Sequence, residues 1–265
     1  MFKHFPAEAV YQIFALIFSV ILVHGAYVTV VRPNAEAVLA EQRALVAKQP
    51  DAAIEPSLYV ILKDYEQESE IILMLWAMAI LAYKWAFVLR ERGLLEEDLL
   101  PLAEGIKILP EDARRYAQPL QALKPALRNL LLPRAMFQAL TRFETTRGVQ
   151  DTASATSALC QNEGERLDSE LAQIRYIAWA IPSIGFIGTV RGISNAMGLA
   201  HRAVQGDISG VTENLGTAFN STLVALLLCL VLMFLVHQLQ LAQESLVLDT
   251  ETYVNDRLIR HLRTS

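Results

Sequence analysis

The chain has 265 residues, of which 53% are hydrophobic and 19% are charged, and its mean hydropathy is positive at +0.31. This balance is unlike that of a soluble globular domain and favours a membrane protein. The net charge is −5 and no long basic run is present, which excludes the electrostatic footprint of a nucleic-acid-binding protein.

The first apolar segment, residues 10–31, exceeds the about 20 residues that a helix needs to cross a bilayer. A cleavable signal peptide is the alternative, but its apolar region is about 7 to 15 residues long and ends at a small-x-small site that is not clear here. We therefore expect a retained transmembrane helix after a cytoplasmic N-terminus at 1–9. His24 lies inside this segment, and we expect a contact with another helix to satisfy it.

Residues 32–70 form an acidic loop that we expect on the outer side of the membrane. Within it, Asn34 is expected to cap a helix that runs to Gln49. The second transmembrane helix is expected at 71–89, with Lys84 near its inner end, where a lysine can extend its amine toward water.

Residues 90–175 hold twelve of the 23 Lys and Arg residues of the chain. By the positive-inside rule this segment is a cytoplasmic helical domain, so that both termini are also cytoplasmic, with a tail at 240–265. Its helices are expected to be divided by prolines at 101, 110, 119, 125 and 133. No strand-like alternation is present, and the expected fold class is all-α, a polytopic membrane protein with four transmembrane helices.

The third transmembrane helix is expected at 176–200 and the fourth at 216–239, joined by an outer loop at 201–215. In the third, small residues recur at spacings of four and three, as one stripe: Ala178, Pro182, Gly185, Thr189, Gly192 and Ala196. Bulkier residues are expected on the other side: Ile177, Ile184, Ile187 and Arg191. Small stripes let helix backbones approach closely in a membrane.

The fourth segment repeats this arrangement with a small face of Ala218, Thr222, Ala225 and Cys229 and a bulky face of Phe219, Leu223, Leu226 and Leu230. Each small face carries one threonine, whose hydroxyl supplies a hydrogen-bonding group where water is scarce. The pattern indicates either a lined pathway or socket for a polar helix, or close packing with each threonine bonded to its own helix. Spacing alone leaves both open.

Two stretches in this region resemble a known family. GFIGTVRGI at 185–193, preceded by ERLDSELAQIRYIAWAIPSI, and LGTAFNSTLVAL at 215–226 are similar to motifs of the MotA/TolQ/ExbB family of proton-channel and stator subunits. The resemblance covers chiefly residues 165–240. The order of a helical insert, a glycine-threonine span, a short loop and a threonine-bearing last span also matches that family.

The resemblance implies a homopentamer in the bacterial inner membrane that surrounds the single transmembrane helices of a partner dimer of the MotB/TolR/ExbD type. In that family the ion-carrying acid is an aspartate of the partner, and residues 176–200 and 216–239 contain no Asp or Glu. By motif, Thr189 and Thr222 are expected to line the route of protons or sodium ions. Secondary pore or partner-contact candidates are Thr217, Asn220, Ser221, Gly185, Gly192 and Arg191.

Two positions depart from the family pattern. Thr217 stands before AF where relatives often carry a glutamate, which leaves the choice of ion open. Arg191 stands where many relatives have an apolar or aromatic residue. Insertion of an arginine at the centre of a transmembrane helix costs about 2.5 to 3.5 kcal/mol. We therefore expect Arg191 to reach the outer interface or to pair with an acid such as Glu213 or Asp207. A role in gating or partner contact is the alternative.

No phosphate-binding loop, nucleophile elbow or metal-ligand spacing is found, so neither an enzyme nor a cofactor or metal is expected. The rival function is a membrane scaffold, in which the small stripes only pack helices and the cytoplasmic domain recruits proteins. A secondary transporter is disfavoured because the four spans show no inverted repeat. The process that is powered does not follow from the sequence.

Overall fold

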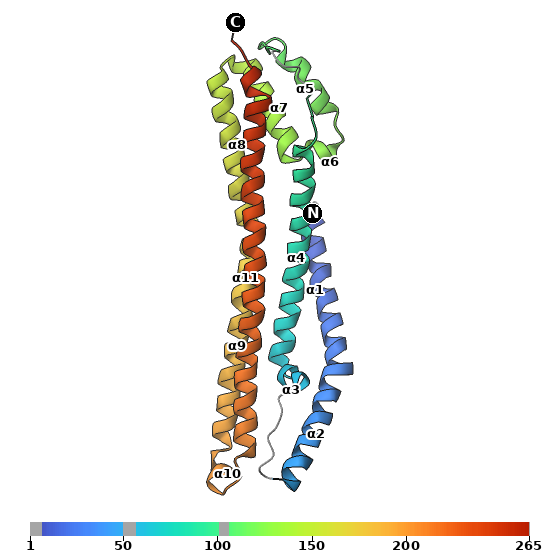
Figure 1. The fold of residues 1–265 in the computed structure, drawn as a ribbon, viewed down its shortest axis with the longest axis vertical. Helices are drawn as coiled ribbons and strands as arrows, with labels where there is room; N and C mark the ends of the chain where they lie inside the picture. The colour runs from blue at the N-terminus through green and yellow to red at the C-terminus, as the bar shows by residue number, and fades with distance from the viewer. Residues whose placement is uncertain (1–6, 50–56, 101–105, 265) are drawn as a thin grey trace, which may run out of the picture. The chain divides into compact units, whose positions relative to one another are not determined.

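The computed structural model describes residues 7–49, 57–100 and 106–264, and these residues are almost entirely helical (Figure 1). In chain order the helices are α1 Ala7–Ala26, the π-helical turn η1 Tyr27–Val31, α2 Arg32–Lys48, α3 Leu58–Leu62, α4 Tyr65–Leu95, α5 Ala113–Ala122, α6 Pro125–Arg128, α7 Leu131–Thr146, α8 Val149–Glu170, α9 Ala172–Gly198, α10 Ala200–Val204, α11 Ser209–Arg257 and the 3-10 turn η2 Ile259–His261. Over the described ranges there is no strand, only one isolated bridge between Ile108 and Leu262. The all-α prediction is confirmed.

The helical segments of α1 with α2, α4, α8 with α9, and α11 with η2 are long and apolar enough to cross a membrane. Four candidate spanning helices are thus present, as predicted. The bounds of the membrane-embedded parts stay predictions, and they are kept below as the apolar runs 10–31, 71–89, 176–200 and 216–239.

Contacts divide the chain into two compact units. The first unit comprises residues 1–82 and 173–236, and the second comprises residues 83–172 and 237–265. Helices α4 and α11 contribute residues to both units.

In the first unit, the N-terminal helix does not end where the sequence predicted. Asn34 was expected to cap a new helix, but it lies inside a continuous helical run from Ala7 to Lys48, and its side-chain amide donates to the carbonyl of Val30 at 2.7 Å. The π-helical turn at Tyr27–Val31 stands directly before Pro33, and the helix continues through the proline. Such turns occur where the regular bonding of a helix is disturbed.

Two hydrogen bonds fix α1 against α4 within the first unit. The Trp76 indole donates to the Gln12 carbonyl at 2.9 Å, and the Tyr11 hydroxyl donates to the Ala79 carbonyl at 3.2 Å. Ala77 on the same helix is fully buried. In an apolar setting the polar tips of Trp and Tyr seek such partners, so these bonds fix the register of the two helices.

In the second unit, a hydrophobic core forms around α7. Leu140 and Phe143 of this helix are fully buried, and residues of α5, α8 and α11 pack around them. The prediction that prolines divide the helices holds only in part, because Pro119 lies inside α5 and Pro133 lies in the first turn of α7. Position 101 lies outside the described residues.

The last residues do not form a separate tail. Helix α11 extends to Arg257, and Leu258 and Leu262 are fully buried in the core of the second unit. The Ile108 amide donates to the His261 carbonyl at 2.8 Å, which joins these residues to the segment before α5. The expected tail at 240–265 is therefore part of a folded unit.

Candidate ion pathway between two helices

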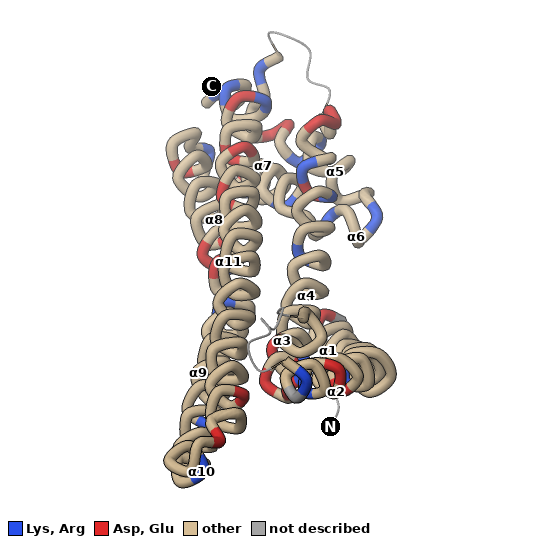
Figure 2. The backbone as a smooth tube through the Cα atoms, turned by 60° about the horizontal axis from the view of Figure 1, so that its bottom comes forward, with Lys and Arg blue, Asp and Glu red and all other residues tan. Residues whose placement is uncertain are grey.

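Within the first unit, the small faces of α9 and α11 pack directly against each other. A Cβ atom added at Gly185 would lie 2.6 Å from the Ala225 Cβ, and one at Gly192 would lie 2.7 Å from the Ala218 Cβ. Figure 1 shows the two helices side by side, and Figure 2 shows few charged positions where they run together. Only glycine permits this approach, because real Cβ atoms do not come so close.

The two predicted pathway threonines meet at this contact. The Thr189 and Thr222 hydroxyls form a hydrogen bond to each other across the two helices. Thr189 is also within bonding distance of the carbonyls of Ala218, at 3.0 Å, and Gly185, at 3.2 Å. The Thr222 hydroxyl donates to the Gly185 carbonyl at 3.1 Å. Both threonines are half-buried, so the hydroxyl pair lies at the rim of the contact and not in its centre.

The hydroxyl pair has more acceptors than protons. Each hydroxyl carries one proton and can accept two hydrogen bonds, while Thr189 has three possible acceptors within reach. Either hydroxyl can donate to the other, so the bond between them can reverse its direction. The pair can therefore accept a hydrogen bond from a neighbouring group or donate one to it, without a movement of the backbone.

The secondary site candidates separate into two groups. Ser221 is fully buried between the helices and is close to the carbonyls of Ala218, at 3.0 Å, and Gly185, at 3.3 Å. Thr217 and Asn220 are half-buried on α11. The contact thus brings Thr189, Thr222, Ser221 and the two glycines together, whereas Thr217 and Asn220 lie on α11 outside the hydrogen bonds described above.

Arg191 does not pair with the acids that the sequence suggested. Its guanidinium donates to the Glu66 carboxylate of α4 at 2.7 Å, and Glu66 is buried. Glu213 instead lies 3.4 Å from Arg43 of α2. The expected pairing with Glu213 or Asp207 is therefore wrong. Residue 66 lies 125 positions before Arg191 in the chain, so only the fold brings the two together.

Bulky side chains cover the other faces of the two helices. Phe219 and Leu230 of α11 are 67% and 70% exposed, as expected for the bulky face of that helix, and Ile187 of α9 is 63% exposed. Ile177 was also expected on the outer side, but it is buried. The exposed apolar residues suit lipid tails or neighbouring subunits.

Sequence reasoning missed a polar cluster at the start of α4. Residues 66, 67, 68 and 70 are all buried, although they were placed in an outer loop. His24 of α1 bonds Glu68 at 2.7 Å, which is the helix contact expected for it, and Arg32 pairs with the same carboxylate. The available signal was periodicity, because Gln67 and Glu70 extend the buried face of α4 marked by Ala77.

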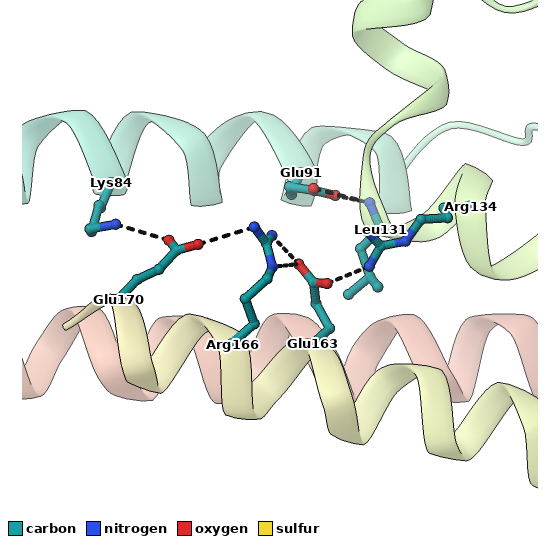
Figure 3. A network of polar contacts seen from close by, with 7 residues as sticks. All are labelled: Lys84, Glu91, Leu131, Arg134, Glu163, Arg166 and Glu170. Atoms are coloured by element: carbon teal, nitrogen blue, oxygen red, sulfur yellow. Dashed lines mark hydrogen bonds and ion pairs between the residues drawn. The ribbon is translucent and has the colours of Figure 1, made fainter. Parts of the chain in front are cut away.

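A chain of charged side chains lies inside the second unit (Figure 3). Lys84 is buried and donates to Glu170 at 2.9 Å. Glu170 also accepts from Arg166 at 3.0 Å, and Glu163 accepts from both Arg166 and Arg134. Lys84 was expected to extend into water at the inner face, and this is wrong because a carboxylate of α8 neutralises it inside the protein.

Glu91 lies beside this network, beyond the apolar run 71–89. Its carboxylate accepts the Leu131 amide with both oxygens, at 3.0 and 2.9 Å, and so caps the start of α7 from α4 (Figure 3). Burial raises the pKa of Glu91 to about 7, opposed by the Leu131 hydrogen bond and helped by the charge of Glu163. For Glu163, burial would raise the pKa, but the hydrogen bonds from Arg166 and Arg134 outweigh it and lower the value.

We expect the second unit to lose stability as pH rises through neutrality, because of Glu91. A carboxyl whose pKa is raised in the fold stabilises it fully below the unfolded value of 4.5, and this contribution disappears as pH rises through about 7. The melting temperature, followed by circular dichroism in detergent, should fall between about pH 5 and about pH 8, and Glu91→Gln should flatten this slope. An equal slope in both proteins contradicts the assignment. Because the pKa of Glu163 is lowered, this residue affects the pH dependence of stability only at pH values below the ordinary carboxyl range.

The comparisons with known proteins identify the region that holds this contact. The sequence model of the MotA/TolQ/ExbB proton channel family matches residues 128–252, which include α7, α8, α9 and most of α11. No curated protein and no solved structure matches the chain. The match begins well before residue 165, where the recognisable motifs start, so α7 and most of α8 also belong to the shared region. The match covers slightly less than half of the chain, and together with the four apolar helices it indicates a multi-pass membrane protein that is similar to a channel family over residues 128–252.

Proposed function

Because residues 128–252 belong to the MotA/TolQ/ExbB proton channel family, we propose that this chain is the channel-forming subunit of a stator or energy-transducing complex driven by the proton-motive force. Five copies surround the transmembrane helices of a single-span, aspartate-bearing partner dimer of the MotB/TolR/ExbD type. The complex lies in the bacterial inner membrane with both termini in the cytoplasm. Protons are the expected ion, with sodium ions as the alternative.

One observation carries the proposal: the hydroxyl pair of Thr189 and Thr222 at the rim of the α9–α11 contact. The two apolar runs that surround it, 176–200 and 216–239, contain no Asp or Glu. These runs can therefore offer hydroxyls and carbonyls to a passing ion, but no carboxylate to carry it. A partner acid facing the pair supplies the missing group.

In this mechanism the partner carboxylate takes up a proton and so loses its charge next to the threonine pair. The charged and neutral forms differ in the hydrogen bonds that they can make, because a carboxylate only accepts and a carboxylic acid also donates. The reversible pair can match either form. Each protonation therefore changes the preferred position of the partner helix, and successive events turn the ring around the partner.

The second candidate function, a membrane scaffold without ion conduction, has an observation of its own. Both hydroxyls already bond to carbonyls of the same protomer, Gly185 for both and Ala218 for Thr189. Packing alone accounts for such bonds, since threonines in membrane helices often bond to the preceding turn. The choice between the two functions therefore rests on ion flux.

Proton flux into vesicles separates the two functions. The chain is reconstituted alone, or together with a single-span protein of the MotB/TolR/ExbD type that carries the membrane aspartate, and internal acidification is followed after an imposed gradient. We expect acidification only when both proteins are present and the partner aspartate is intact. Replacement of that aspartate with asparagine should abolish the flux. Equal flux with and without the partner, or none in any sample, contradicts the proposed channel.

A further inference from the structure

The first turns of α4 contain a polar cluster in which only some members are neutralised. Glu66 pairs with Arg191, and Glu68 pairs with Arg32 and His24. Two further buried polar residues of these turns are different. Gln67 and Glu70 are 0% exposed, and none of their side-chain oxygen and nitrogen atoms has a hydrogen-bond partner among the described residues.

Glu70 has electrostatic neighbours but no counter-charge. It interacts with Glu66, one turn before it on α4, and with Tyr27 of η1, whose buried hydroxyl is also without a partner. The charges of Glu68, Asp64 and Arg32 also act electrostatically on the Tyr27 hydroxyl. Both arginines of the region, Arg32 and Arg191, are already bound by Glu68 and Glu66.

A carboxylate in this position would be very costly. An isolated charge that is removed from water without a partner loses many times the energy of one hydrogen bond, so such a group binds a proton instead. A metal ion is a poorer candidate, since no group of three His, Cys, Asp or Glu side chains in the described ranges is arranged to hold one. The chemistry of the cluster therefore fits a proton.

The cluster also lies next to the candidate pathway. A Cβ atom added at Gly188 would lie 3.1 Å from the Glu66 Cγ and 2.4 Å from the Ser221 hydroxyl, and Gly188 is the neighbour of Thr189 in the chain. Gln67 and Glu70 lie one turn apart on α4 and share a face of that helix. A proton held at Glu70 is thus close to the helices that carry the threonine pair.

We propose that Glu70 is a proton-binding carboxyl of this chain, which exchanges its proton with the outer solution and supplies the pathway along α9 and α11. Hydronium gives its proton to the Glu70 carboxylate and becomes water; the Glu70 acid later returns this proton to water on the way to the partner acid. Gln67 and the Tyr27 hydroxyl, which are buried without a hydrogen-bond partner in the described part of the chain, are the groups that we expect to hold a water beside the acid. The inference rests on the proposed function for the direction of transfer, whereas proton binding at Glu70 does not depend on it.

Labelling with a hydrophobic carbodiimide tests proton binding directly in the unaltered protein. The reagent adds to a carboxylic acid, takes up its proton and leaves a stable N-acylurea, and it reacts poorly with paired carboxylates. The tryptic peptide 64–84 of the membrane-embedded complex contains Glu66, Glu68 and Glu70, so fragmentation shows which one is modified. We expect several-fold more label on Glu70 than on the other two, with a decrease as the pH of labelling is raised. No label on Glu70, or equal label on all three, overturns the proposal.

Flux measurements then test the supply of protons. Glu70→Gln should lower partner-dependent proton flux several-fold with unchanged copurification of the partner, and Glu36→Gln, which removes an exposed carboxyl of the same unit, should not. Full flux in Glu70→Gln overturns the role in transfer even if Glu70 is labelled. If the unaltered complex conducts no protons at all, the proposed function fails, and labelling still decides whether Glu70 binds a proton.

Discussion

Replacement of Gly192 with alanine is expected to force α9 away from α11 and to destabilise the assembled protein. The new methyl group would lie 2.7 Å from the Ala218 Cβ and 2.8 Å from the Asn214 carbonyl oxygen. One of these is backbone and the other is a side chain without rotamers, so neither can move aside by itself. Overpacking of this kind costs about 1 to 3 kcal/mol, and in the proposed pentamer every subunit would carry this cost. Thermal unfolding and size-exclusion chromatography of the detergent-solubilised complex measure it.

Gly198→Ala is the matched control for this change. Gly198 ends the same helix, and a Cβ atom at that position meets nothing within 4 Å. Since alanine also favours helix more than glycine does, this variant should be as stable as the unaltered protein or slightly more stable. Equal melting temperatures for the two variants would mean that the close approach of α9 and α11 does not support the fold.

Loss of the hydroxyl pair is expected to reduce ion-coupled activity much more than stability. Thr189→Val and Thr222→Val keep the shape of the side chain and remove its hydrogen-bonding group. An ion or partner acid left without that group loses about 1 to 3 kcal/mol, which corresponds to a roughly 5- to 150-fold lower rate. The backbone carbonyls of Gly185 and Ala218 lie inside helices and keep their own amide partners there. Partner-dependent proton flux in vesicles is the measurement.

The serine variants provide the control for the threonine pair. Thr189→Ser and Thr222→Ser retain the hydroxyl and should keep most of the flux, while all four variants should copurify with the partner to the same extent. Should both valine variants conduct protons at the normal rate, the threonines serve packing alone, and the scaffold becomes the better description of the chain.

The features that follow a local period could be predicted from the sequence. The four apolar helices and the two small faces depend on residue spacing within one helix, and the family motifs lie on those same faces. The prediction that Asn34 caps a new helix was wrong for a reason that is also local. Asparagine and proline near each other usually mark a helix start, but the π-helical turn before Pro33 lets the helix continue.

The pairings of charges could not be predicted, because they depend on which helices are neighbours. Arg191 had acids close to it in sequence, yet it binds Glu66 of α4, and Lys84 binds Glu170 of α8. The burial of Glu70 is of the same kind. A run of polar residues before an apolar helix ordinarily indicates a solvated loop, and only the packing of other helices around the first turns of α4 removes it from water.

The bond between Arg191 and Glu66 has a consequence for biogenesis. The ribosome completes α4 before it begins α9, so the acid is already in place next to the apolar run 71–89 when the arginine arrives. An arginine that enters alone resists partitioning by about 2.5 to 3.5 kcal/mol, and a waiting carboxylate offsets that resistance. In the proposed membrane arrangement, the earlier hairpin thus acts as an internal insertion aid for the later one, because the segment made first holds the counter-charge for the segment made second.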